Sequence, residues 1–277
     1  MNDVYLWLLP AVFVVAALYA SVGHGGGSGY LALLALTGVV DPASMSTTAL
    51  LLNVVVAGIG TWTFARGGHL RWSVTWPFIV ASIPLAFVGG LVDVDPVVYG
   101  ALLAISLGAA ALRIAQTARV HGADDVVLSS LASEVSTSRG GVATLRAPTR
   151  LEARPLRLRV AVPTGGAIGL VSGIVGVGGG IFLSPIMLLR RWGTARQIAA
   201  TSAVFVLVNS FAGLIGRAAS GSLAVDGLAP LLLAATAGGV IGARLGAHHV
   251  DGVRLRYALA AVLAIAAVKS LLLVVPA

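Results

Sequence analysis

The sequence contains no cysteine, and only 10% of its 277 residues are charged. Without cysteine the chain has no disulfides, thiolate metal ligands or cysteine nucleophiles. The scarcity of charge excludes an ordinary globular enzyme and a disordered chain, because soluble domains carry about a quarter charged residues. Hydrophobic residues make up 58% of the chain and the mean hydropathy is +0.98, which predicts an all-α membrane protein that crosses the lipid bilayer many times.

Carboxylates are missing from the interiors of the apolar runs. All 10 Asp and Glu residues lie in breaks between runs or near run ends. Carriers coupled to protons or metal ions commonly keep a carboxylate inside the membrane, so this pattern argues against them. No nucleotide-binding loop or nucleophile triad is visible either. We therefore expect a protein that is not an enzyme and that uses no cofactor or metal.

Basic residues outnumber acidic ones, with 18 Lys and Arg residues and a net charge of +8. Nearly all of this charge lies in short breaks between apolar runs. Arginines retained on the cytoplasmic side of a membrane give the same excess. The positive charge therefore predicts membrane topology and not a nucleic-acid partner.

Two of the apolar runs are too long for one helix. A single crossing needs roughly 20 apolar residues, which fits most of the runs. The runs 4–40 and 160–189 exceed this length, and each contains a glycine cluster that should break its helix. The runs are 4–40, 42–65, 72–92, 96–112, 160–189, 197–216, 227–243 and 257–268.

The sequence is an internal duplication. Gly23 and Gly176, which begin the two glycine clusters, are 153 residues apart, and the same offset aligns Thr48 with Thr201. Equivalent breaks in the two halves carry opposite charge, as expected for an inverted repeat under the positive-inside rule. Inversion requires an odd number of crossings between the halves. Each half is therefore predicted to be a glycine-broken re-entrant helical hairpin plus three transmembrane helices.

This inverted structural repeat places every Lys and Arg except Arg217 and Lys269 on the cytoplasmic side, whereas a parallel repeat leaves more of them outside. The segment between the halves is rich in Ser, Thr, Gly and Arg, which is typical of a linker. The predicted domains are a first transmembrane repeat (1–118), a cytoplasmic linker (119–157) and a second transmembrane repeat (158–277).

The glycine clusters predict a binding site. Irregular backbone is tolerated at membrane depth only where protein buries it or where it lines a watery cavity. The helices that follow the clusters present N-termini, each carrying about half a positive charge, and two such ends together form a site for a small anion. Close helix packing is the alternative explanation for the glycines. The predicted backbone site comprises Gly25, Gly26, Gly27, Ser28, Gly178, Gly179 and Gly180.

Polar side chains at mid-depth complete the predicted site. Asn and Thr can donate hydrogen bonds to sulfonate-like oxygens, although interhelical bonding is an alternative role for hydroxyls. A histidine in the first glycine cluster could pair with the anion and make binding pH-dependent, or could be hydrogen-bonded in a packed loop. The predicted side-chain contacts are His24, Thr48, Asn53, Thr201, Ser202 and Asn209.

At these residues the chain resembles the sulfite exporter TauE/SafE family, also called the TSUP permeases. The second half has a glycine loop at 176–180, then Ser184-Pro185, Ala200-Thr201-Ser202 and Asn209, as in that family. The first half has the partner motif at 23–27 and Thr47-Thr48. Its departures from the family pattern are Ala32 in place of proline and Ala49 in place of serine.

The resemblance implies a secondary transporter of small sulfur oxyanions such as sulfite, or of organosulfonates such as sulfoacetate, in a prokaryotic plasma (inner) membrane. We expect export by alternating access, because an anion leaving a negative interior gains about 2.3 kcal/mol per charge per 100 mV. A homo-oligomer is compatible with the sequence. An anion channel with the same site is the alternative, and a membrane scaffold that binds partners through the linker is a further hypothesis.

Overall fold

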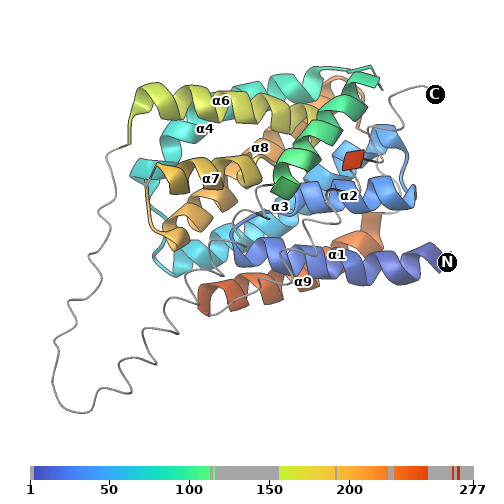
Figure 1. The fold of residues 1–277 in the computed structure, drawn as a ribbon, viewed down its shortest axis with the longest axis horizontal. Helices are drawn as coiled ribbons and strands as arrows, with labels where there is room; N and C mark the ends of the chain where they lie inside the picture. Colours follow the sequence, from blue (N-terminus) through green and yellow to red (C-terminus); the bar gives the residue numbers. More distant parts are fainter. Residues whose placement is uncertain are drawn as a thin grey trace, which may run out of the picture.

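A computed structural model describes residues 3–95, 97–112, 115, 156–190, 192–223, 228–248, 264, 267 and 268. Within these residues the chain is helical and contains no strand (Figure 1). The predicted linker and the predicted crossing at 257–268 lie almost wholly outside them. The helices are α1 (Asp3–Ser21), α2 (Gly27–Thr37), α3 (Pro42–Arg66), α4 (Trp72–Leu91), Val97–Leu112, α6 (Leu158–Val175), α7 (Gly180–Leu189), α8 (Ala195–Ala219) and α9 (Leu228–His248).

Five of the described helices, α3, α4, α6, α8 and α9, are long and apolar enough to cross a membrane. Val97–Leu112 and the apolar parts of α1 and α2 are shorter. Large apolar side chains cover the outer surface, including Trp7, Ile105 and Leu233, which are 77%, 69% and 73% exposed. Apolar surface of this extent is unfavourable in water, so the described helices are suited to a lipid environment.

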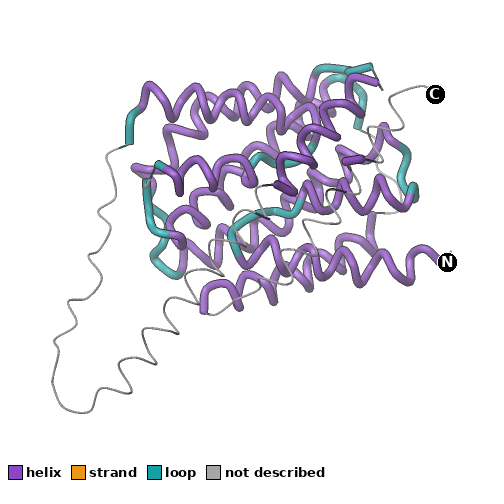
Figure 2. Tube along the Cα trace, in the orientation of Figure 1, coloured by secondary structure: helices purple, strands orange, loops and turns teal. Residues whose placement is uncertain are grey.

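Both long apolar runs break at their glycine clusters, as predicted. α1 ends at Ser21 and α2 begins at Gly27, while α6 ends at Val175 and α7 begins at Gly180. Each break contains glycines with positive φ angles, a conformation that residues with a Cβ rarely adopt. Figure 2 shows the two breaks as loops inside the bundle, whereas the other described connections lie at its ends.

The helices of the second half repeat those of the first at the predicted offset. α3 begins at Pro42 and ends at Arg66, and α8 begins and ends 153 residues later, at Ala195 and Ala219. The packing repeats as well. α1 packs along α9, and their equivalents in the other half, α6 and α4, pack along each other. α3 and α8, which are equivalent to one another, are in contact and join the two pairs.

Small residues bring these paired helices close together. Every fourth residue of α6 from Gly165 to Gly173 is a glycine that lies against the backbone of α4. Every fourth residue of α9 from Gly238 to Gly246 lies against the backbone of α1 in the same way. A Cβ at any of these positions would overlap a carbonyl group. Close backbone contact of this kind supplies the van der Waals attraction that holds helices together in lipid.

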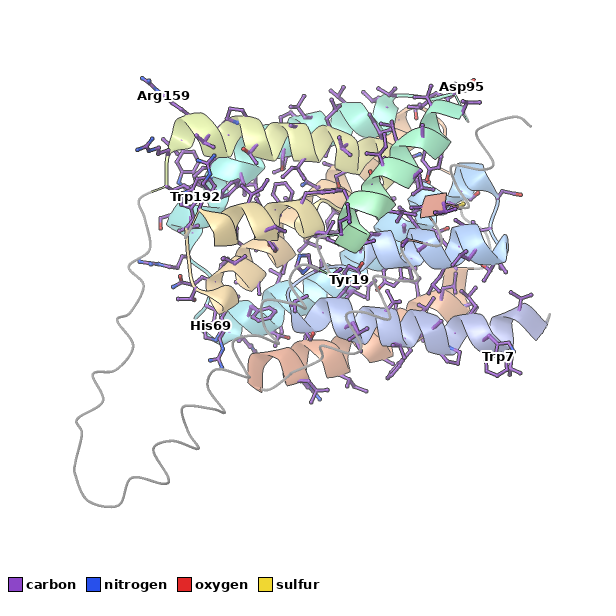
Figure 3. The ribbon with its side chains drawn as sticks, viewed as in Figure 1. Trp7, Tyr19, His69, Asp95, Arg159 and Trp192 are labelled. Atoms are coloured by element: carbon purple, nitrogen blue, oxygen red, sulfur yellow. The ribbon has the colours of Figure 1, made fainter. Side chains whose placement is uncertain are left out.

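The two ends of the bundle differ in charge. Figure 3 places His69, Arg159 and Trp192 at one end and Trp7 and Asp95 at the other. α1 begins at the end of the bundle that carries Trp7, and α6 begins at the end that carries Arg159 (Figure 1 and Figure 3). These equivalent helices therefore point in opposite directions. We name the end that carries Arg159 the basic end. Described arginines within four residues of the labelled residues of this end in the sequence are Arg66, Arg71, Arg157, Arg190 and Arg196, and Arg244 lines a groove together with Arg66.

Candidate functional site

The two glycine loops meet beside the middle of α3 and α8. Gly25 and its repeat equivalent Gly178 both lie against Asn53 of α3 and Val206 of α8, which are also repeat equivalents. A Cβ at Gly178 would lie 2.7 Å from Asn53 Nδ2 and 2.9 Å from Val206 Cγ1, closer than such atoms pack. Close packing therefore requires glycine at both positions. Equivalent positions of the two halves therefore meet at this point.

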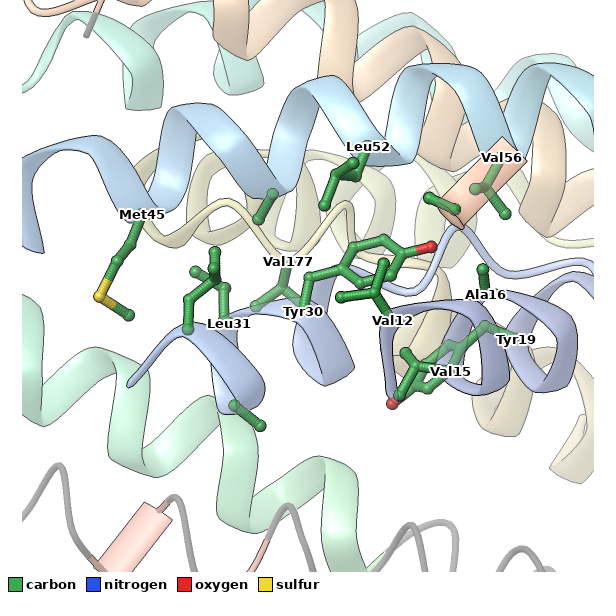
Figure 4. Close-up of a cluster of buried hydrophobic side chains, with 14 of the residues drawn as sticks. Val12, Val15, Ala16, Tyr19, Tyr30, Leu31, Met45, Leu52, Val56 and Val177 are labelled. Atoms are coloured by element: carbon green, nitrogen blue, oxygen red, sulfur yellow. The ribbon is translucent and has the colours of Figure 1, made fainter. Parts of the chain in front are cut away.

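The contacts between the two loops also come in equivalent pairs, related by the 153-residue offset. Gly27, the first residue of α2, lies against the backbone of Val177, and Gly180, the first residue of α7, lies against the ring of His24. Figure 4 shows Val177 beside Tyr30, in a buried cluster otherwise dominated by residues of the first half. Each loop thus packs against the start of the helix that follows the other loop.

His24 joins the first loop to the second half of the chain. Its Nε2 atom lies 3.0 Å from the carbonyl oxygen of Gly180 and 3.1 Å from Ser184 Oγ. Because a carbonyl oxygen only accepts hydrogen bonds, we assign the proton of the neutral ring to Nε2. Ser184 Oγ lies 2.7 Å from Ser202 Oγ. The predicted site residues His24 and Ser202 are therefore connected through the hydroxyl of Ser184.

Asn53 and Thr48 of α3 are completely buried. The Asn53 Nδ2 group donates a long hydrogen bond of 3.5 Å to the carbonyl oxygen of Gly176. Asn53 Oδ1 and Thr48 Oγ1 have no hydrogen-bond partner among the described residues. An unpaired buried polar atom costs roughly 1–3 kcal/mol, and an amide can turn to exchange its donor and acceptor. The Asn53 amide is therefore a suitable contact for a small bound molecule.

Two helix N-termini lie at the same place. α2 begins at Gly27 and α7 at Gly180, beside the opposite loop in each case. Ser28, in the first turn of α2, has its Oγ atom 2.7 Å from the hydroxyl of Tyr19. The first N–H groups of a helix lack partners within the helix, and the helix dipole makes this end positive. The arrangement favours a small anion over a cation.

Thr201 and Asn209 make their contacts elsewhere, at the interface between α4 and α8. Thr201 Oγ1 lies 3.1 Å from Thr75 Oγ1, and Asn209 Oδ1 accepts a 2.6 Å hydrogen bond from Ser82 Oγ. Among the predicted site residues, the structure brings together the glycines of both loops, His24, Asn53 and Ser202. It joins Thr201 and Asn209 to side chains of α4.

Sequence reasoning does not include Ser184 or Tyr19 in the site. Ser184 follows Gly180 by four residues, one helical turn, so it shares a face with the start of α7. That spacing is the signal that could have identified it. Tyr19 is one apolar aromatic residue among many in α1, and only its contact with Ser28 reveals it.

The chemistry of the site follows from these groups. The described part of the site combines helix N-termini, hydroxyls, an amide and an imidazole, and it contains no carboxylate. Among the described residues, no group of three or more His, Asp or Glu could hold a metal ion. Neutral donors and positive helix ends can bind and release an anion without covalent chemistry.

A family model and one known protein match the chain over nearly its whole length, and a second protein matches about a third of it. Residues 8–270 match the family described as sulfite exporter TauE/SafE. A probable membrane transporter protein, y4hK, of Sinorhizobium fredii is 36% identical over 271 residues, which cover 98% of this chain and 100% of the relative. A probable membrane transporter protein of Xylella fastidiosa is 36% identical over 99 residues, which cover 35% of this chain and 38% of the relative. No solved structure matches the chain.

The family match and the full-length relative agree with the helices described above. Five of these helices are suited to crossing a membrane, and their glycine-broken neighbours meet at the centre of the bundle. The chain therefore belongs to the sulfite exporter TauE/SafE family and is a multi-pass membrane transporter.

Proposed function

We propose that this protein is a secondary transporter that exports a small sulfur-containing oxyanion, such as sulfite or the organosulfonate sulfoacetate, across a prokaryotic plasma membrane. The observation that carries the proposal is the meeting of two glycine loops and two helix N-termini beside Asn53, His24 and Ser184. The description of the family as sulfite exporters supports both the substrate class and the direction.

The binding mode rests on the contacts of the loops. The anion lies between the starts of α2 and α7, where backbone N–H groups of Gly25 to Gly27 and Gly178 to Gly180 face it. The Asn53 amide and the linked His24, Ser184 and Ser202 side chains supply further contacts. Thr48 contributes its unpaired hydroxyl from α3. Thr201 and Asn209 act through the α4–α8 interface, where their bonds to α4 hold α8 in position.

The proposed topology is an inverted repeat. α1 and α2 enter and leave the bundle at the end of Trp7, and α6 and α7 enter and leave at the basic end (Figure 1). Both pairs are re-entrant hairpins in this proposal, and the basic end faces the cytoplasm. Alternating access follows if the two interlocked halves rock about a twofold axis near Asn53 and Val206.

The transport proposal is tested with purified protein in liposomes. Uptake of sulfite, sulfate, thiosulfate, sulfoacetate and a carboxylate control is measured under an imposed membrane potential. We expect saturable flux and counterflow for a sulfur oxyanion. Flux that increases linearly with concentration and shows no counterflow supports an anion channel instead. An absence of flux for all sulfur oxyanions contradicts the substrate class.

Cysteine labelling tests the topology, and the natural chain provides a cysteine-free background. Gly68 and Gly221 are repeat equivalents with similar φ angles of 70° and 73°, and a Cβ at either meets no atom within 4 Å. We expect Gly68→Cys to react only from the cytoplasmic side and Gly221→Cys only from the other. Labelling of both from one side would contradict the inverted repeat.

A further inference from the structure

A groove outside the candidate site separates α3 from α9 at the basic end. Its volume is about 550 Å³. The two arginines of the groove lie near the ends of their helices, and the other lining residues lie deeper along them. The lining comprises Arg66, Arg244, Trp62, Thr63, Ile59, Gly58 and Val240, and the Thr63 hydroxyl donates to the Ile59 carbonyl of its own helix.

The outer part of the groove carries positive charge beside an aromatic ring. The guanidinium carbon of Arg66 lies 4.2 Å from the centroid of the Trp62 ring, and Trp62 is 61% exposed. Three carboxylates have described side chains, those of Asp41, Asp93 and Asp95. All three precede or follow helices at the opposite end of the bundle. Among the described carboxylates, none is therefore near enough to neutralise the arginines.

The inner part of the groove is apolar. Gly58 precedes Arg66 by eight residues, which corresponds to about 12 Å along the helix axis. Ile59 and Val240 line this deeper part, and the nearest atom to a Cβ at Gly58 would be Leu207 Cδ1, at 3.9 Å. Glycine at position 58 thus leaves open space in the helix surface. The groove is therefore positively charged at its outer part and apolar at its inner part. A lipid leaflet changes in the same order, from the phosphate groups to the acyl chains.

The equivalent surface in the second half lacks both charges. Trp62 and Arg66 correspond to Ile215 and Ala219 of α8, and Arg244 corresponds to Leu91 of α4. Ile215 is 59% exposed, so its surface faces outward as Trp62 does. The equivalent helices α8 and α4 therefore pack together without arginines at these positions. The arginine pair is present at this position in only one of the two equivalent surfaces.

We propose that the α3–α9 groove binds one anionic phospholipid, whose phosphate contacts Arg66 and Arg244 and whose acyl chain lies over Gly58. Basic pockets between helices at a membrane surface bind anionic headgroups, and an aromatic residue at headgroup depth anchors the contact. The proposal does not depend on the transported substrate, because lipid binding is measured without transport.

Native mass spectrometry of the full-length protein in detergent tests the proposal, with phosphatidylglycerol and phosphatidylcholine of identical acyl chains. We expect one phosphatidylglycerol to be retained in preference to phosphatidylcholine. The double variant Arg66→Gln, Arg244→Gln should lose this retention by a factor on the order of 20, since each arginine near a membrane surface contributes roughly a factor of five. Gly58→Leu should weaken retention with both arginines present.

The matched control is Arg71→Gln, Arg196→Gln, which removes two exposed arginines from the same end outside the groove. Retention should persist in this control. Equal retention of both lipids, equal loss in the control, or unchanged retention in the groove variant would each overturn the proposal. Displacement of the lipid by millimolar sulfite or inorganic phosphate would also overturn it, because the groove would then bind free anions.

Discussion

In the first glycine loop the end of α1 is closed by bonds within its own last turns, whereas in the second loop the end of α6 is closed by one backbone bond and is also capped by side chains from other helices. The His24 N–H donates to the Tyr19 carbonyl at 2.8 Å, and the Gly23 N–H donates to Ala20. At the end of α6 the Gly176 N–H donates to the Ser172 carbonyl in a similar way. In addition, carbonyls of residues 173 to 176 accept hydrogen bonds from Arg217, Ser46, Tyr99 and Asn53.

The capping residues have no polar equivalents in the other half. Arg217 corresponds to Phe64, Asn53 to Val206 and Ser46 to Ala199. His24 likewise corresponds to Val177. Both halves contain the broken backbone, but the polar side chains around it differ at equivalent positions. The first half supplies most side chains that contact the loops, and the second half supplies most of the carbonyls that they cap.

The largest expected effect comes from adding a side chain at the point where the loops meet. Gly178→Val should reduce transport by at least about 100-fold, because its Cβ would overlap Asn53 and Val206 and because its φ of +79° disfavours a β-branched residue. Flux into liposomes measures the effect. Gly221→Val is the control, because Gly221 also has a positive φ but a Cβ there meets no atom within 4 Å. This variant should retain transport.

Comparison of two alanine variants sharpens this test. Gly25→Ala adds the same Cβ at the equivalent position, where φ is not positive. Gly178→Ala should therefore be the more damaging of the two, by about 1–2 kcal/mol of stability in a thermal unfolding assay. If Gly25→Ala lowers stability as much as Gly178→Ala does, the positive φ at Gly178 makes no difference between the two loops.

The next largest effect concerns the cap of α6. Arg217→Met removes the 3.2 Å and 2.7 Å bonds to the carbonyls of Gly173 and Ile174 in a buried place. The Ile174 carbonyl keeps its 3.4 Å bond from Ser46 Oγ, so only the Gly173 carbonyl loses its side-chain partner. We expect the free energy of unfolding to fall by about 1–3 kcal/mol, measured by thermal unfolding in detergent.

The matched change in the first loop is Ser21→Ala, which removes one bond to Leu18 within the same turn. This variant should lower stability by about 1 kcal/mol or less. Equal effects of the two changes would show that both helix ends are held by local bonds, contrary to the structure.

Moving the histidine tests whether the asymmetry matters for transport. His24→Val should reduce transport about tenfold, because the link from the first loop to Ser184 is lost. Adding Val177→His should not restore it, since the partners Ser184 and Ser202 correspond to Leu31 and Ala49 in the first half. Restored flux in the double variant would mean that the two loops are interchangeable.

The smallest effect is expected for Ser184→Ala. Loss of one neutral hydrogen bond should raise the KM for the transported anion about fivefold with little change in stability. Thr75→Val removes a hydroxyl of similar burial at the α4–α8 interface, and it should lower stability by about 1 kcal/mol without changing KM. A KM change in Thr75→Val alone would move the site to that interface.

Much of the fold could be predicted from particular residues. Three glycines in succession weaken a helix, so breaks at the two glycine clusters were predictable, and the helices that follow begin at the last glycine of each cluster, Gly27 and Gly180. The family resemblance at the same residues is confirmed by the match over residues 8–270. The predicted inverted topology, the linker at 119–157 and the identity of the anion stay predictions.

The composition of the site was less predictable. Thr201 and Asn209 are polar residues at mid-depth, as are Asn53 and Ser202, and periodicity does not tell which helix each one faces. Contact with Thr75 and Ser82 shows that α4 lies against that face of α8. Ser184 lies one helical turn after Gly180, which makes it a candidate, and the contact with His24 from 160 residues away shows that it belongs to the site.

The sequence by itself determined where the chain is apolar, where it breaks and where it repeats, because hydropathy and helix propensity act over a few neighbouring residues. The tertiary structure alone decided which polar side chain caps which loop, and that the two loops meet at Asn53 and Val206. Those contacts join residues from about 30 to 160 positions apart, and several of them join one half of the chain to the other. The packing of interlocked halves, which follows from close glycine contacts between α1 and α9 and between α4 and α6, brings them together.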